Sequence, residues 1–258
     1  MSRVTSIEEL SNLKSKIETE RKFTKQVLIC GGTGCISSGS NEIADKMTEK
    51  VKAAGKENEI RVIKTGCFGF CEKGPIVKML PDNTFYTEVT PEDADRLVET
   101  HLLKEEKIEE LLYVDPVTKN KISDSDHMDF YKKQERVALR NCGVIDPENI
   151  EDYLLHDGYT ALDKVLKMSQ QEVVDIMKDS GLRGRGGGGF PTGLKWQFAL
   201  NNVSDQKYVV CNADEGDPGA FMDRSILEGD PHSVVEAMAI CGYSIGSNHG
   251  LVYIRAEY

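Results

Sequence analysis

The chain has 258 residues, enough for two domains, and its 39% hydrophobic and 29% charged residues are ordinary for a globular protein. A net charge of −11 without a basic run argues against a general nucleic-acid-binding surface, and no apolar stretch approaches the ~18 residues of a membrane span. The N-terminus is charged and helical in pattern, unlike a signal peptide, so we expect a cytoplasmic protein.

The first half of the chain predicts one small domain after an amphipathic N-terminal helix over residues 1–23. The run QVLIC predicts a buried strand that ends at Cys30. The next predicted elements are a helix over SNEIADKMTEKVKAAG, a strand over EIRVIKTG, a hairpin of PIVKML and FYTEV, and a helix over TPEDADRLVETHLL with Thr90 as N-cap. The order β-α-β-β-β-α suits a thioredoxin-like domain over residues 24–112.

The second half predicts a different α/β domain. Residues 113–135 are polar and poorly periodic, and we expect a linker that wraps over a neighbour. Residues 136–258 predict helices up to Asp179, with a capping box that starts at Ser169. A short helix (GLKWQFALNN), a buried strand (KYVVCNA), an apolar helix (SVVEAMAICGYSIG) and a strand (LVYIRAEY) follow, a pattern typical of a nucleotide-binding layer. The chain stops inside a strand-like run, so we expect a fragment of a longer polypeptide.

Four of the seven cysteines form two pairs, Cys30 with Cys35 and Cys67 with Cys71. Each pair lies in a glycine-bearing loop directly after a predicted strand, so neighbouring strand ends would bring four thiolates together. Iron–sulfur clusters need four soft anionic ligands, and glycine lets backbone N–H groups approach the sulfides. The spacing favours a [2Fe–2S] cluster. A zinc site, which usually has tighter knuckles, and four unrelated buried cysteines are the alternatives.

The stretch SGLRGRGGGGFPTGLKW has seven glycines within thirteen residues. Its three cations are Arg183, Arg185 and Lys195. A G-x-G-x-x-G match begins at Gly184, but a predicted helix precedes it where the dinucleotide fingerprint requires a strand, and Leu194 interrupts a P-loop match. Exposed N–H groups, the cations and a helix N-terminus near Gly193 still predict an anion cradle.

Amide and carboxylate side chains crowd into CNADEGDPGAFMDR, directly after a predicted strand. They are Asn212, Asp214, Glu215 and Asp217. The plain interpretation is a solvated acidic turn. The functional one is a loop that hydrogen-bonds sugar or ribityl hydroxyls while the glycine loop takes a phosphate, and a dinucleotide or flavin carries both groups.

Two known families resemble these segments. CGGTGC…CFGFCEKGP resembles the thioredoxin-like [2Fe–2S] ferredoxin domain. The glycine loop, the acidic loop and DRSILEGDPHSVVEAMAICGY resemble the flavin- and NADH-binding subunit of respiratory complex I, and more closely its relatives in NAD-linked, electron-bifurcating hydrogenases and formate dehydrogenases. A ferredoxin domain fused ahead of the flavin domain is the arrangement of the hydrogenase flavoprotein (beta) subunit. The implied fold is α/β, with the ferredoxin domain followed by the first half of the complex I-type FMN/NADH-binding domain.

The resemblance implies a [2Fe–2S] cluster and FMN as cofactors, with NAD(H) stacked over the flavin. Residues implied to hold FMN are Gly184, Arg185, Gly186, Gly187, Lys195, Asn212, Asp214 and Glu215. Residues implied to face NADH are Phe190, Lys195, Phe198, Glu215 and Asp217. Complex I relatives often have glutamate where this chain has Asp217, and we expect the two carboxylates to disfavour the 2′-phosphate of NADPH. A [4Fe–4S] cluster is expected only in a C-terminal part beyond Tyr258.

The function implied is that of an NADH:acceptor oxidoreductase (diaphorase) subunit in a multisubunit electron-bifurcating hydrogenase. The implied partners are an iron–sulfur hydrogenase catalytic subunit, a small thioredoxin-like [2Fe–2S] subunit and ferredoxin. FMN carries the hydride chemistry, so no residue is expected to be catalytic in the acid–base sense. The same role in a formate dehydrogenase or a complex I-like dehydrogenase, a non-enzymatic [2Fe–2S] relay, and a zinc-bearing assembly protein are the alternatives. Outside these motifs, Cys211 and Cys241 are expected in the core, His232 as a structural cap or surface residue, and Cys142 has no assignment.

Overall fold

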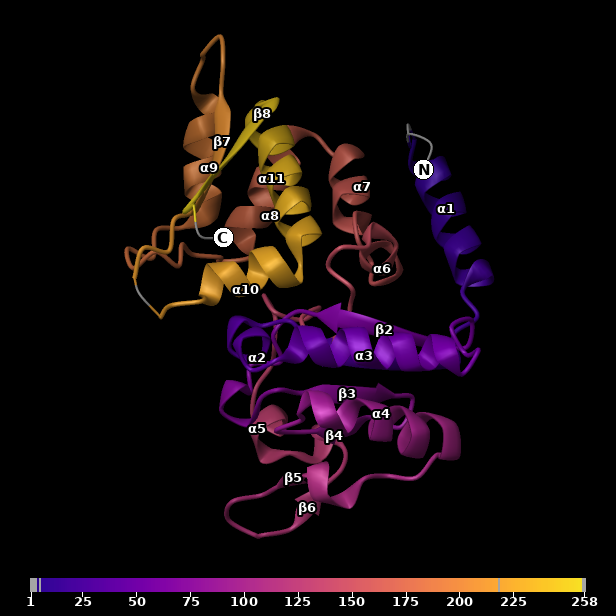
Figure 1. Ribbon diagram of the computed structural model, residues 1–258. Helices are drawn as coiled ribbons and strands as arrows, with labels where there is room; N and C mark the ends of the chain where they lie inside the picture. The colour runs from indigo at the N-terminus through magenta and orange to yellow at the C-terminus, as the bar shows by residue number, and fades with distance from the viewer. Residues whose placement is uncertain (1–3, 5, 218, 257–258) are drawn as a thin grey trace. The chain divides into compact units, whose positions relative to one another are not determined.

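The computed structural model describes residues 4, 6–217 and 219–256. The chain divides into two compact units, and each is described by itself (Figure 1). The N-terminal unit comprises Ser11–Leu155 together with Ser225–Asp230. The C-terminal unit comprises Met1–Leu10, His156–Arg224 and Pro231–Tyr258. Within the described ranges, no helix is both long enough and apolar enough to cross a bilayer.

The N-terminal unit is built on one four-stranded sheet with the strand order β2-β1-β3-β4. Its strands are β1 (Lys25–Cys30), β2 (Ile60–Thr65), β3 (Val77–Leu80) and β4 (Thr84–Tyr86). β1 is parallel to β2, whereas β3 is antiparallel to both β1 and β4. Cys30 is paired with Thr65 in the parallel register, so the loops that follow β1 and β2 leave the same edge of the sheet.

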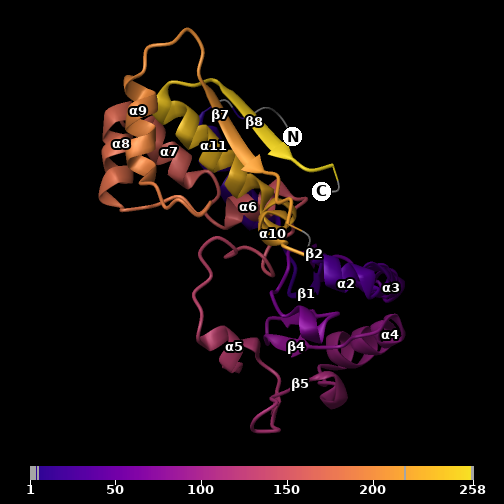
Figure 2. The ribbon, with the colours of Figure 1, turned by 90° about the vertical axis from the view of Figure 1, so that its left-hand side faces the viewer.

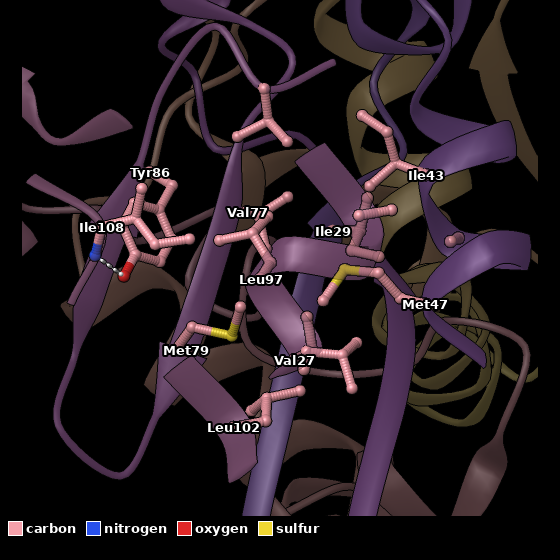
Figure 3. Close-up of a cluster of buried hydrophobic side chains, with 14 of the residues drawn as sticks. Val27, Ile29, Ile43, Met47, Val77, Met79, Tyr86, Leu97, Leu102 and Ile108 are labelled. Carbon is pink, nitrogen blue, oxygen red and sulfur yellow. Dashed lines mark hydrogen bonds between the residues drawn. The ribbon is translucent and has the colours of Figure 1, made fainter. Parts of the chain in front are cut away.

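The helices of this unit are α1 (Ile7–Glu20, which begins in the other unit), α2 (Thr33–Ser37), α3 (Ser40–Ala53) and α4 (Ala94–Arg96), and the order of elements confirms the expected β-α-β-β-β-α pattern. α3 and α4 cover one face of the sheet. The helix that contains α4 starts with a 3₁₀ turn at Pro91, where Thr90 and Asp93 form the expected N-terminal cap, and ends in a π-helical turn, Leu97–Leu102. Val27, Met47 and Leu97 meet in its core (Figure 3).

The segment expected as a linker packs on the sheet of the N-terminal unit. It contains a small hairpin, β5 (Tyr113–Val114) with β6 (Lys121–Ile122), and the short helix α5 (Asp129–Lys132); α6 (Ile150–Leu155) follows. The backbone of β4 bonds to this segment, since the Phe85 N–H donates to the Ser123 carbonyl at 2.7 Å. Met128 is fully buried in a cluster with Phe85 on the second face of the sheet. Residues beyond the four strands therefore complete the core.

The C-terminal unit contains a two-stranded parallel sheet, with α11 packed against its strands. Its elements are α7 (Thr160–Leu166), α8 (Gln170–Asp179), α9 (Thr192–Asn201), β7 (Tyr208–Ala213), α10 (Met222–Gly229, which ends in the other unit), α11 (Pro231–Ile245) and β8 (His249–Ile254). The capping box of Ser169 and Glu172 at the start of α8 is confirmed. β7 and β8 run side by side along α11 (Figure 2).

Two expectations about burial in this unit are wrong. The apolar run of β7 predicts a buried strand, but Tyr208 and Val210 are 54% and 59% exposed, because α11 packs against the strands and leaves the other face of the sheet open. Cys211 on β7 and Cys241 on α11 are half-buried, so they lie outside the core.

Candidate cofactor sites

The structure brings the four paired cysteines together at the edge of the sheet where β1 and β2 end. Cys30 is the last residue of β1, Cys35 lies on α2, and Cys67 and Cys71 follow β2. The Sγ atoms of Cys67 and Cys71 are 3.7 Å apart, and the Cys30 thiol interacts with both Cys35 and Cys67. Cys30 and Cys35 are buried, whereas Cys71 is exposed.

These thiols perturb one another. The hydrogen bond with Cys35, together with burial, raises the pKa of Cys30 to about 11, while the same bond lowers the pKa of Cys35. The hydrogen bond with Cys30, followed by burial, raises the pKa of Cys67. Burial is the main reason that the pKa of Cys71 is raised. Four adjacent thiolates need balancing positive charge, which soft metal ions supply.

The glycines around the thiols fit an inorganic cluster. A Cβ on Gly32 would lie 3.0 Å from the Cys67 Sγ, and one on Gly74 would lie 2.6 Å from the Cys35 Sγ. The Gly69 N–H donates to the Cys67 Sγ at 3.3 Å. Among the described residues, no three His, Cys, Asp or Glu side chains converge on a single metal ion. A [2Fe–2S] cluster needs only two thiolates at each iron, and this donor set fits it.

Cys142 is a further buried thiol that has no assignment from the sequence. Within the N-terminal unit its Sγ donates to the Ser225 carbonyl at 3.5 Å. A Cβ on Gly66 would lie 3.0 Å from this sulfur, and one on Gly229 would lie 2.6 Å from it. Burial raises the pKa of the thiol to about 11. The surrounding glycines leave no room for larger groups, so Cys142 is a packing residue.

Two backbone hydrogen bonds join the two ends of the glycine loop in the C-terminal unit. The Gly184 N–H donates to the Phe190 carbonyl and the Thr192 N–H to the Leu182 carbonyl, both at 2.9 Å. A Cβ on Gly186, Gly187 or Gly188 would meet no atom within 4 Å. The loop is therefore an open arch of bare backbone whose cations, Arg183, Arg185 and Lys195, are exposed. Such an arch suits a phosphate.

The helix that follows the loop is fixed by one close contact. α9 begins at Thr192, as expected for a helix N-terminus near Gly193. A Cβ on Gly193 would come within 2.4 Å of the Lys178 backbone nitrogen on α8, so only glycine permits this approach. Phe190 and Phe198 are 46% and 63% exposed, with ring centroids 6.4 Å apart. The pair offers aromatic surface beside the arch.

The acidic loop after β7 has a structural role that the sequence did not predict. The Glu215 carboxylate accepts hydrogen bonds from the Asp223 and Arg224 N–H groups, at 2.9 and 3.0 Å, and so caps the start of α10. The Asn212 side-chain oxygen accepts from the Asp214 N–H at 3.2 Å. Asp217 is exposed. Of the two carboxylates expected to face NADH, Glu215 is thus engaged with the protein backbone.

Comparison with known proteins identifies both halves. Residues 3–102 match the thioredoxin-like [2Fe-2S] ferredoxin family, and residues 177–258 match the Nuo51 FMN-binding domain. The chain contains both of these domains. The expected family resemblance, fold class and cofactor domains are confirmed. The domain boundaries and the individual site residues remain predictions.

The similar proteins include subunits of a hydrogenase and of a quinone oxidoreductase, and a ferredoxin. The NADP-reducing hydrogenase subunit HndC of Solidesulfovibrio fructosivorans is 70% identical over 127 residues, which are 49% of this chain and 26% of that protein. An NADH-quinone oxidoreductase subunit of Rhizobium meliloti is 49% identical over 48% of this chain and 30% of that protein. A solved thioredoxin-like [2Fe-2S] ferredoxin from Aquifex aeolicus is 33% identical, with a TM-score of 0.32, over 34% of this chain and 95% of that one. The chain thus spans less than a third of the length of these two curated relatives.

Proposed function

We propose that the chain is part of a flavoprotein subunit that passes electrons between NAD(H), FMN and iron–sulfur clusters in an NAD(P)-linked hydrogenase. The observation that carries this proposal is the presence, in one chain, of a four-thiol site and an open cationic glycine arch. The 70% identity to a hydrogenase subunit supports it. FMN, when bound, accepts hydride as an electron pair and releases single electrons.

The residues of this chain bind and orient the cofactors. The bare backbone of Gly186 and Gly187 lets phosphate oxygens approach N–H groups, and Arg185 and Lys195 supply positive charge. Phe190 and Phe198 offer rings for stacking against nicotinamide or adenine. The four cysteines hold the [2Fe–2S] cluster. No side chain is assigned an acid–base step.

The finer proposal is an electron-bifurcating [FeFe]-hydrogenase in the cytoplasm, with a catalytic iron–sulfur subunit, a small [2Fe–2S] subunit and ferredoxin as partners. The fused ferredoxin domain supports it. The same role in a complex I-like dehydrogenase is the second candidate, favoured by the 49% identity to a quinone oxidoreductase subunit. The flavin-binding part would act alike in both.

Cofactor analysis of the purified full chain under anaerobic conditions tests the proposal. We expect two irons and two acid-labile sulfides in the N-terminal unit, together with FMN that NADH bleaches. Iron without flavin would favour an electron relay over a diaphorase. Zinc in place of iron would overturn the redox function altogether.

Coenzyme preference is expected to depend on Asp217 more than on Glu215. The exposed Asp217 carboxylate is free to repel a 2′-phosphate, whereas the Glu215 carboxylate caps α10. Asp217→Asn should raise kcat/KM for NADPH relative to NADH at least about tenfold, the effect of removing one charge within about 12 Å at an effective dielectric constant of about 20. Glu215→Gln should leave that ratio within about twofold. Steady-state reduction of an artificial acceptor by both coenzymes measures the ratio, and a larger effect of Glu215→Gln would contradict the assignment.

A further inference from the structure

Residues 128–143, here called the clasp, lie outside both matched family regions and hold the second cysteine loop of the N-terminal unit. The Tyr131 hydroxyl donates to the Phe68 carbonyl at 3.0 Å. The Arg136 guanidinium donates to the Cys67 carbonyl at 3.1 Å through Nη2, and to the Cys142 carbonyl at 3.3 Å through Nη1. Two successive carbonyls of the loop are therefore bound by side chains of the clasp.

Packing joins the same two segments. The Phe68 ring is 4% exposed, and a Cβ on Gly143 would come within 2.7 Å of it. Gly143 has φ = +82°, and its N–H donates to the Thr65 hydroxyl, at the end of β2, at 3.1 Å. Only glycine adopts this backbone conformation readily and leaves room for the ring. The conformation of the loop thus depends on the clasp.

The clasp also places a positive charge beside Gly69, the residue whose N–H donates a hydrogen bond to the Cys67 sulfur. Gly69, at φ = +78°, directs its N–H at the Cys67 Sγ. A Cβ on Gly69 would lie 3.4 Å from the Arg136 Nη2, so the half-buried guanidinium rests against this residue. Hydrogen bonds to sulfur, net charge and solvent exposure are the protein's means of setting cluster potentials.

We propose that Arg136 is a positioning residue for the [2Fe–2S] cluster, which holds the Cys67 loop through its two carbonyl contacts and raises the reduction potential through its charge. The inference rests on the cluster of the proposed function. Addition of one electron to a four-thiolate cluster adds one negative charge, and a fixed cation several ångströms away stabilises that charge. At an effective dielectric constant of about 20, a cation within about 12 Å favours reduction by at least about a factor of ten.

The test is an EPR-monitored dithionite titration of the full chain, in its complex, with variants of Arg136. Arg136→Gln removes the charge, and Arg136→Lys keeps the charge but loses the two-pronged contact. Arg140→Gln, an exposed arginine in the clasp, is the matched control for net charge. For Arg136→Gln we expect the equilibrium constant for reduction to fall at least about tenfold, which for a one-electron couple lowers the potential by at least about 59 mV. For Arg136→Lys we expect a potential near that of the wild type but faster loss of iron to a chelator.

The outcomes separate this inference from the proposed function. A wild-type chain that assembles no [2Fe–2S] cluster would refute the proposed function itself. An intact cluster in Arg136→Gln with the potential of Arg140→Gln would overturn only the role of Arg136. If Arg136→Gln holds no cluster, a wild-type potential in Arg136→Lys supports the role of the charge. Unfolding of both Arg136 variants, seen by circular dichroism, would show a purely structural residue and overturn the inference.

Discussion

Replacing Cys35 with alanine is expected to leave the N-terminal unit folded but without its iron. The Cys35 thiol is buried on α2, beside the Cys30 thiol and against Gly74. Three remaining thiolates cannot complete the ligand set of a [2Fe–2S] cluster. Alanine is the sharper change, because the hydroxyl of serine would offer iron an oxygen ligand. Bound iron should fall at least about tenfold, measured by iron and sulfide analysis and by visible absorbance.

Cys142→Ala is the matched control for that experiment. This thiol is also buried in the N-terminal unit, beside Gly66, but it has no partner at ligand spacing. We expect the variant to keep two irons per N-terminal unit and to lose some stability, about 1 kcal/mol, because a small cavity replaces the sulfur. Iron loss in Cys142→Ala equal to that in Cys35→Ala would contradict the assignment of the four ligands.

The sequence predicted the cysteine site because its geometry is local. Each pair lies within one loop, and the parallel register of β1 and β2 brings both loops to one edge of the sheet. The clasp was not predicted, since Arg136 lies 69 residues from Cys67 in the sequence and directly after a polar, poorly periodic segment. Long-range hydrogen bonds from side chains to carbonyls leave no periodic signal.

In the flavin-binding segment, too, the features set by neighbouring residues were predicted, whereas those set by packing or by a side chain with two possible roles were not. The arch and the start of α9 follow from glycine content and helix-start rules, which are local. The capping of α10 by Glu215 was missed because carboxylates in a turn suit a ligand and a helix N-terminus equally well. The apolar run of β7 indicated a buried strand, but strand burial depends on what covers both faces of the sheet.

Two glycine-to-alanine changes should separate binding from stability in the C-terminal unit. Gly186→Ala places a methyl group in the open arch, where it meets no protein atom within 4 Å. Its unfolding free energy should stay within about 0.5 kcal/mol of the wild-type value, while FMN affinity should fall at least about tenfold because the methyl group holds the phosphate away from the backbone. Gly193→Ala drives a methyl group to within 2.4 Å of the α8 backbone. The helices must then separate, which should cost about 1–3 kcal/mol.

The unfolding free energy and the FMN affinity of each variant can be measured in one sample. Trp196, the single tryptophan of the chain, lies on α9 and reports unfolding of this unit in urea, and quenching of flavin fluorescence reports FMN binding. Under conditions where Gly193→Ala remains folded, it should bind FMN within a few-fold of the wild type, since its methyl group points at α8 and leaves the arch unchanged. Equal destabilisation by the two changes would show that the arch is packed rather than open. Unchanged FMN affinity in Gly186→Ala would remove the glycine arch from the flavin site, because a phosphate seated on that backbone could not share its space with a methyl group.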